Sequence, residues 1–161
     1  FNQLADDELV GGYMYIYEDV NANKSIKEII AHNNLFVPNI NNVPHYESTQ
    51  SAIWLKADIR VETDEPVYLL FNYPIIDSIE LFAVGQKGAI IQHKTSGSML
   101  PAAGKDLHDN YIKFKLQKGL YTYYIRAKTT YTLQLPIKIK SFLFEDANII
   151  LCNKDSGFCV E

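Results

Sequence analysis

The sequence has few Cys, Met and Trp residues and no long apolar run of the kind that crosses a membrane. It contains two Cys, two Met and one Trp among 161 residues. Its 15 Lys and Arg against 19 Asp and Glu give a net charge of −4, which argues against a nucleic-acid binder because such proteins carry a concentrated basic patch. In the given residues we expect no segment that crosses a bilayer and no signal peptide, because no run is long and apolar enough. The chain begins at Phe1 rather than Met, so we expect a trimmed or excised piece of a longer protein.

Motifs of the common catalytic and cofactor sites are also missing. There is no Gly-x-Ser-x-Gly elbow, phosphate loop, dinucleotide fingerprint or His-Glu-x-x-His run. The histidines are isolated in or beside predicted loops, where solvated side chains are more common than metal ligands: His32, His45, His93 and His108. Asp106 and Asp109 flank His108, but polar residues in a Gly/Pro loop are more often exposed than catalytic. Carboxylate pairs of the glycosidase type meet only in space, so the sequence neither favours nor excludes them. We expect no enzyme, no metal and no cofactor.

The two cysteines lie close together near the end of the chain. The segment between Cys152 and Cys159 is turn-like, so the two sulfurs could meet across a small loop. A metal or redox pair would need nearby His partners or a two-residue spacing, and free thiols are the remaining alternative. The pattern favours a disulfide, which would indicate an exported protein.

Alternating apolar and polar residues predict an all-β fold. Many Tyr, Phe, Val, Ile and Thr favour strands. We predict strands over residues 13–19, 52–62, 66–73, 77–84, 89–93, 110–116, 120–128 and 131–141. Ser25 and Glu28 form a capping box that opens one short helix over residues 26–31. Residues 33–46 and 95–109 are predicted loops. The best match is a jelly-roll β-sandwich (galactose-binding-like), with an extension over 1–12, the domain over 13–142 and a second extension over 143–161.

The polar side of these strands carries the best candidate for a binding surface. In the strand over residues 52–62, apolar side chains alternate with charged ones, and Trp54 falls on the charged side with Lys56. Tyr124, Arg126 and Gln134 share this polar parity on later strands. A flat aromatic ring beside bidentate donors can hold a sugar or a small anion. The alternative is structural: the Asn-rich loop or the short helix covers Trp54.

Several segments, in order, resemble a known family. They are Ser51–Lys56, Asp64–Pro66, Tyr73–Phe82, Ser96–Gly97, Tyr124–Arg126 and Leu133–Pro136, preceded by Tyr15–Asp19 and the short helix. Over about residues 13 to 142, the chain resembles the second type of extracellular sensor domain found ahead of seven-transmembrane receptors with diverse intracellular signalling modules (7TMR-DISM). It departs from the family pattern at Ser98, where the family usually has Asp.

The resemblance implies a jelly-roll domain on the periplasmic or extracellular side of a bacterial inner membrane. It would bind a carbohydrate or another small ligand and signal through a seven-helix membrane region to a cytoplasmic histidine kinase or diguanylate cyclase. Tyr73 and Asp77 join the candidate site because they lie in the matching segments, which gives Trp54, Lys56, Tyr73, Asp77, Tyr124, Arg126 and Gln134. A carbohydrate-binding module of a polysaccharide-degrading enzyme is the alternative function. The expected partners are the small ligand and the membrane region, and a homodimer stays open.

Overall fold

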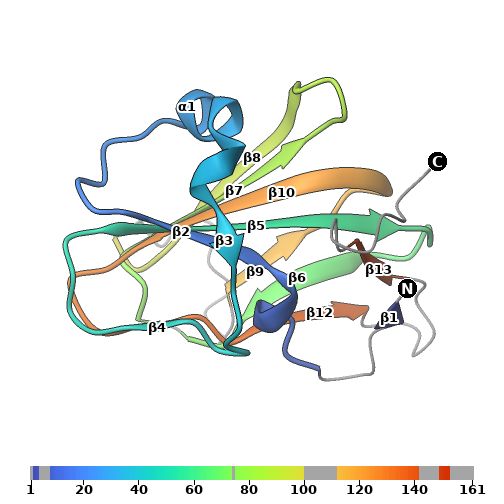
Figure 1. Cartoon of the computed structure of the whole chain (residues 1–161). Coiled ribbons are helices and arrows are strands. Elements are labelled where there is room, and N and C mark those ends of the chain that lie inside the picture. The colour runs from blue at the N-terminus through green and yellow to red at the C-terminus, as the bar shows by residue number, and fades with distance from the viewer. Residues whose placement is uncertain (1, 4–7, 74, 100–111, 142–148, 153–161) are drawn as a thin grey trace.

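The computed structural model describes residues 2–3, 8–73, 75–99, 112–141 and 149–152, and its strands form two main layers (Figure 1). The eight-stranded sheet has the order β1 (Asn2–Gln3), β13 (Ile149–Cys152), β5 (Ala52–Val61), β10 (Gly119–Lys128), β7 (Ser78–Val84) and β8 (Ile90–Ser96). Two further strands extend it, because β2 (Tyr15–Asp19) pairs with β5, and β3 (Val37–Pro38) pairs with β2. The three-stranded sheet has the order β12 (Ile137–Ser141), β6 (Val67–Phe71) and β9 (Ile112–Lys115). A short ribbon pairs β4 (His45–Tyr46) with β11 (Leu133–Gln134).

The two sheets enclose the main hydrophobic core, and the predicted all-β sandwich is confirmed. Ile53, Leu55 and Ile59 of β5 point toward the smaller sheet, and none of them is exposed to solvent. Leu69 and Phe71 of β6 meet them from the other layer. Each such side chain contributes about 1.5–3 kcal/mol through its removal from water, so the period-two apolar pattern is what fixes the two-layer arrangement.

Helical turns are few in the described part of the chain. The capping box is present, since the Ser25 hydroxyl accepts the Glu28 backbone N–H while Glu28 accepts the Ser25 N–H, and it opens α1 (Ile26–Ala31) as predicted. Two 3-10 turns complete the set, η1 (Gly11–Tyr13) and η2 (Asn33–Leu35). The predicted loop over 33–46 therefore contains η2, β3 and β4.

Apart from shifts at strand ends, two predicted assignments differ from the structure. The strand expected over 131–141 is divided into β11 and β12, because Pro136 has no N–H to donate and the Leu135 N–H instead donates to the Pro44 carbonyl. The region expected to be a C-terminal extension contributes β13, which pairs antiparallel with the second half of β5. On its other side β13 pairs antiparallel with the N-terminal strand β1.

A second, smaller core lies on the opposite side of the large sheet, which we call the outer face. The segment from α1 through η2 to β3 crosses this face (Figure 1). Its buried members form what we call the outer cluster: Ile29, Phe36, Trp54, Phe82, Val84 and Tyr124. The large sheet is thus covered on both sides where α1 and η2 lie.

Candidate functional site

Strand register brings four of the predicted site residues together on the outer face. In the antiparallel pair β5–β10, Trp54 lies opposite Arg126 and Lys56 lies opposite Tyr124. Directly opposed residues in such a pair have side chains within contact distance. The predicted parity of these four residues is therefore confirmed.

The expectation that this face is open to water at Trp54 is wrong. Trp54 is 1% exposed, Tyr124 is 3% exposed and Lys56 is 7% exposed. Ile29 of α1 and Phe36, which follows η2, pack over them in the outer cluster. The physical reason is that the amphipathic α1 and the adjoining Phe36 need an apolar surface, and the aromatic residues of the outer face provide it. Trp54 is therefore covered by the short helix and the Asn-rich segment, which was the structural alternative to a binding surface.

Polar groups under this cover are held by the chain itself. The Asn33 side-chain oxygen in η2 accepts hydrogen bonds from Lys56 Nζ at 3.0 Å and from the Tyr124 hydroxyl at 3.1 Å. Burial, followed by the nearby Asp58 charge, raises the pKa of Tyr124 to about 12, so the phenol stays protonated. The Trp54 Nε1 atom is buried and makes no hydrogen bond to the described residues.

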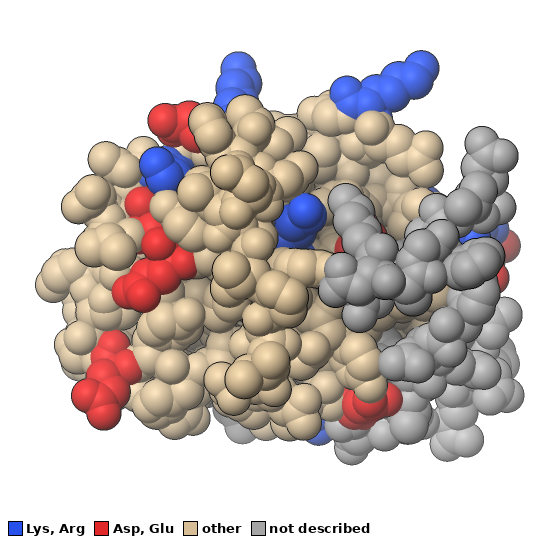
Figure 2. Space-filling model, in the orientation of Figure 1, with Lys and Arg blue, Asp and Glu red and all other residues tan. Residues whose placement is uncertain are grey.

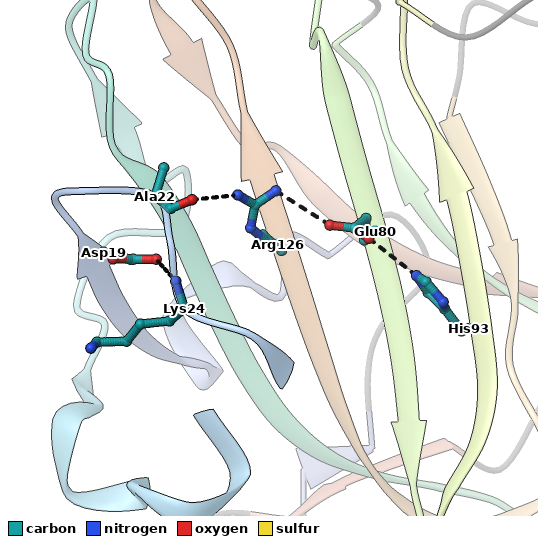
Figure 3. Close-up of polar contacts among 6 residues, drawn as sticks. All are labelled: Asp19, Ala22, Lys24, Glu80, His93 and Arg126. Carbon is teal, nitrogen blue, oxygen red and sulfur yellow. Dashed lines mark hydrogen bonds and ion pairs between the residues drawn. The ribbon is translucent and has the colours of Figure 1, made fainter. Parts of the chain in front are cut away.

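A row of polar contacts runs across the outer face beside the outer cluster (Figure 3). The Arg126 guanidinium donates to Glu80 Oε2 at 3.3 Å and to the Ala22 carbonyl at 3.1 Å. The other Glu80 oxygen lies 3.1 Å from His93 Nε2, and the His93 ring stacks on Phe82 with centroids 4.2 Å apart. Arg126 thereby ties the loop before α1 to the sheet.

A different part of the molecule, which we call the loop end, gathers Tyr73 and Asp77. It consists of three turns: residues 72–73 with 75–77 after β6, residues 97–99 after β8, and residues 129–132 after β10. The Tyr73 hydroxyl donates to the Thr132 carbonyl at 3.0 Å. Asp77 Oδ2 accepts the Thr130 backbone N–H at 2.8 Å and the Thr130 hydroxyl at 3.0 Å, and Asp77 Oδ1 accepts the Ser98 hydroxyl at 3.4 Å. One carboxylate therefore joins all three turns.

These hydrogen bonds keep the Asp77 carboxylate charged. The Thr130 backbone N–H is the main reason that the pKa of Asp77 lies below its usual value. Burial opposes this shift, and the Thr130 and Ser98 hydroxyls add to it. Gly97 lets the turns approach, because it has φ +133° and a Cβ at this position would lie 2.4 Å from the Asp77 carbonyl oxygen. The loop end thus holds the Asp77 carboxylate in one orientation on closely packed turns.

Comparison with known protein families agrees with this architecture. The family model described as 7TMR-DISM extracellular 2 matches residues 11–141, which is most of the chain. The chain belongs to this family. It is therefore an extracellular sensor domain of a seven-transmembrane receptor. A search of curated proteins finds no match.

The remaining predicted residues of this 7TMR-DISM domain lie in several places. Gln134 lies in β11 opposite His45 of β4, two residues after Thr132 of the loop end. Cys152 is the last residue of β13, and Cys159 lies outside the described residues, so the disulfide stays a prediction. His108 and its flanking Asp106 and Asp109 also lie outside them. Within the described ranges, no three His, Cys, Asp or Glu side chains are grouped so that they could hold a metal ion, and no helix could span a membrane.

Sequence reasoning missed three exposed apolar residues at the loop end. Tyr131 is 61% exposed, Met99 is 76% exposed and Ile75 is 52% exposed, and each belongs to one of the three turns that Asp77 joins. The sequence signal was the Thr-Thr-Tyr-Thr run over 129–132, which places an aromatic residue between short polar residues typical of turns. Assigning Tyr131 to a strand hid this signal.

Proposed function

We propose that this 7TMR-DISM domain binds a small carbohydrate at its loop end. In this proposal the domain lies in the periplasm of a bacterium, and ligand occupancy is passed through the seven-helix region to a histidine kinase or a diguanylate cyclase. Family membership favours this receptor function over a carbohydrate-binding module of a degrading enzyme. Tyr73, Asp77 and Gln134 stay in the proposed site, and Tyr131 joins them.

The observation that carries the proposal is the exposed Tyr131 ring, which follows directly after Thr130, the residue that hydrogen-bonds to the Asp77 carboxylate. Sugars present C–H groups on one face and hydroxyls around the rim. An aromatic ring can pack against the C–H groups, while a carboxylate accepts hydrogen bonds from the hydroxyls. Thr130 fixes the Asp77 carboxylate through two hydrogen bonds, so little side-chain freedom is lost when a ligand binds.

The outer face is a weaker candidate for the same ligand. A sugar reaching Trp54 would have to displace Ile29 and Phe36, which are 0% and 8% exposed. It would also have to replace the contacts that Asn33 makes with Lys56 and Tyr124. Lifting these groups would return buried apolar area to water at a cost of about 25 cal/mol per Å². We therefore assign Trp54, Lys56, Tyr124 and Arg126 to holding α1 and η2 on the sheet.

Signal transfer requires that the ligand prefers one of two conformations of the domain. The three turns of the loop end connect strands of both sheets, since β6 belongs to the smaller sheet and β7, β8 and β10 to the larger one. A ligand that contacts all three turns would bias the relative position of the two layers. A preference of about 1–3 kcal/mol for one arrangement is the typical size of such coupling.

A glycan array of mono- and disaccharides, followed by calorimetric titration, tests the proposal. Tyr131→Ala and Asp77→Asn should each weaken binding of any sugar hit at least tenfold, which corresponds to about 1.4 kcal/mol. Ile91→Ala is the matched control, because Ile91 is 48% exposed on β8, outside the three turns. Equal affinity of the Tyr131 variant and the wild type, or a loss only in the Ile91 variant, would contradict the loop-end site.

A further inference from the structure

The outward face of the smaller sheet carries basic residues and no acidic ones. The inward positions of β9 and β12 belong to the main core, and they include Phe114, Ile137 and Ile139. Successive side chains of a strand point to opposite sides, so the residues between these positions point away from the core. We call the outward residues of the three strands the lysine face: Tyr68 and Leu70 of β6, Lys113 and Lys115 of β9, and Lys138 and Lys140 of β12.

Strand register arranges the lysine face in two parallel rows. The rows consist of Lys138, Leu70 and Lys113, and of Lys140, Tyr68 and Lys115. Each row therefore has a lysine on both outer strands and an apolar or aromatic residue on the central strand. Neighbouring strands lie about 4.8 Å apart, and alternate residues of one strand lie about 6.8 Å apart. The backbone positions of all four lysines thus fall within about 12 Å of one another.

Charges of one sign are gathered here, in contrast to the rest of the molecule. The three strands of the smaller sheet contain four Lys and no Asp or Glu, although the whole chain has 15 basic and 19 acidic residues. On the outer face of the large sheet, Arg126 is paired with Glu80. On the side of the molecule drawn in Figure 2, basic side chains lie apart from one another and acidic ones gather toward the left. The lysine face is therefore a positive surface on a domain with a net charge of −4.

The lysine side chains cover the sheet while their ends reach outward. Lys113 and Lys115 are exposed and Lys138 and Lys140 are half-buried, whereas Leu70 between them is 6% exposed. The hydrocarbon part of a lysine can lie on an apolar surface while its ammonium group stays in water. Lys113, Lys138 and Lys140 also interact within the chain. An ammonium group has three donors, so such a contact leaves donors for a further anion.

We propose that the lysine face binds the anionic phospholipid headgroups of the membrane that anchors the receptor. The chain belongs to a family of extracellular domains of seven-transmembrane receptors, so a bilayer surface lies near the domain. A broad sheet face with four ammonium groups complements a layer of phosphates, which lysine binds as a compact charge. Tyr68 adds an amphipathic ring of the kind that is enriched where membrane and water meet. This inference does not depend on the loop-end ligand site.

A weak attraction is sufficient because the domain is tethered. One lysine near an anionic membrane surface raises the affinity about fivefold, and the effect falls off within a Debye length of about 10 Å at 0.1 M salt. The four lysines are about that far apart, so they act on one patch of headgroups. The membrane region of the same receptor keeps the domain at a high effective concentration near the bilayer. In this position the large sheet and α1 face away from the bilayer, because they lie on the other side of the smaller sheet (Figure 1).

Co-sedimentation of the 161-residue chain with phospholipid vesicles tests the proposal. One set of vesicles contains phosphatidylcholine alone, and the other contains equal parts of phosphatidylcholine and phosphatidylglycerol. The chain should bind only the second set at about 0.1 M salt, and it should be released at about 1 M, where the Debye length falls to about 3 Å. Lys113→Gln combined with Lys115→Gln should weaken binding at least about tenfold, because two contributions of about fivefold are removed. Lys138→Gln combined with Lys140→Gln should do the same.

The matched control removes two lysines from other parts of the surface. Lys27 is exposed on α1, and Lys87 is exposed in the turn between β7 and β8. Lys27→Gln combined with Lys87→Gln therefore gives the same net charge as either double variant of the lysine face. Circular dichroism verifies that each variant is folded. Binding that the control retains and that both lysine-face variants lose supports the proposal.

Three results would overturn the membrane assignment. The first is a wild-type chain that does not bind the phosphatidylglycerol vesicles at the lower salt concentration. The second is a control variant that binds these vesicles as weakly as the lysine-face variants, because net charge and not the face would then decide binding. The third is retention of the chain by a soluble polyuronate without vesicle binding, which would assign the lysine face to an acidic polysaccharide.

Discussion

The outer face and the loop end each present an aromatic residue beside polar groups, yet they differ in their access to water. Trp54 on the outer face is 1% exposed, whereas Tyr131 at the loop end is 61% exposed. Lys56 and Tyr124 meet the amide oxygen of Asn33, and Arg126 meets Glu80 and the Ala22 carbonyl. At the loop end, Asp77 joins three turns that each carry an exposed apolar side chain: Ile75, Met99 and Tyr131.

This comparison shows that the side of a strand on which a residue lies does not determine its exposure. Strand alternation assigns Trp54 to the side opposite the main core, and the register agrees. Whether that side is wet depends on what the rest of the chain places over it. Here α1 and the residues after it build the outer cluster, so the aromatic surface stabilises the fold.

The largest effect on stability is expected from truncating Trp54, and truncating Tyr131 provides the comparison. Trp54→Ala should lower the free energy of unfolding by about 3–5 kcal/mol, because it leaves a large cavity in the outer cluster. Tyr131→Ala should change it by no more than about 0.5 kcal/mol, as is usual for exposed side chains. Urea denaturation followed by circular dichroism measures both values. Similar losses in the two variants would remove the distinction between the covered and the open region.

A smaller effect is expected from titrating Asp77, and it sharpens the description of the loop end. Because the pKa of Asp77 is lower in the folded than in the unfolded chain, its carboxylate stabilises the fold fully above the ordinary aspartate value of about 3.9. This contribution is lost as the pH falls through the lower folded value. Asp77→Asn has no such titration, so the stability advantage of the wild type over the variant should shrink below about pH 4.

Denaturation midpoints of the two proteins between about pH 2 and 7 measure this difference, a range that spans the ordinary aspartate pKa. A difference that stays constant over the whole range would show that the Thr130 and Ser98 hydrogen bonds do not favour the ionised form. The fold would be unaffected by that result, but the anionic group in the proposed ligand site would lose its support.

Most of the fold was predictable from the sequence because the relevant signals are local. Alternation in the region of β5 predicted its inward residues, and the Ser25–Glu28 capping box predicted the start of α1. The site was less predictable because its parts meet only in space. Asp77 accepts a hydrogen bond from Thr130, 53 positions later in the chain, and no pattern near either residue indicates this contact. The cover over Trp54 likewise depends on Phe36, which the sequence places in an irregular loop.

The fluorescence of the only tryptophan tests the central claim most directly, which is that the outer face is covered and is not an open binding surface. Trp54 is the single Trp in the chain, so its emission reports on the outer cluster alone. The account predicts emission at short wavelength in the folded protein and weak quenching by acrylamide, with strong quenching only after unfolding in urea. Emission at the wavelength of a hydrated indole, with quenching as strong in the folded as in the unfolded protein, would contradict it.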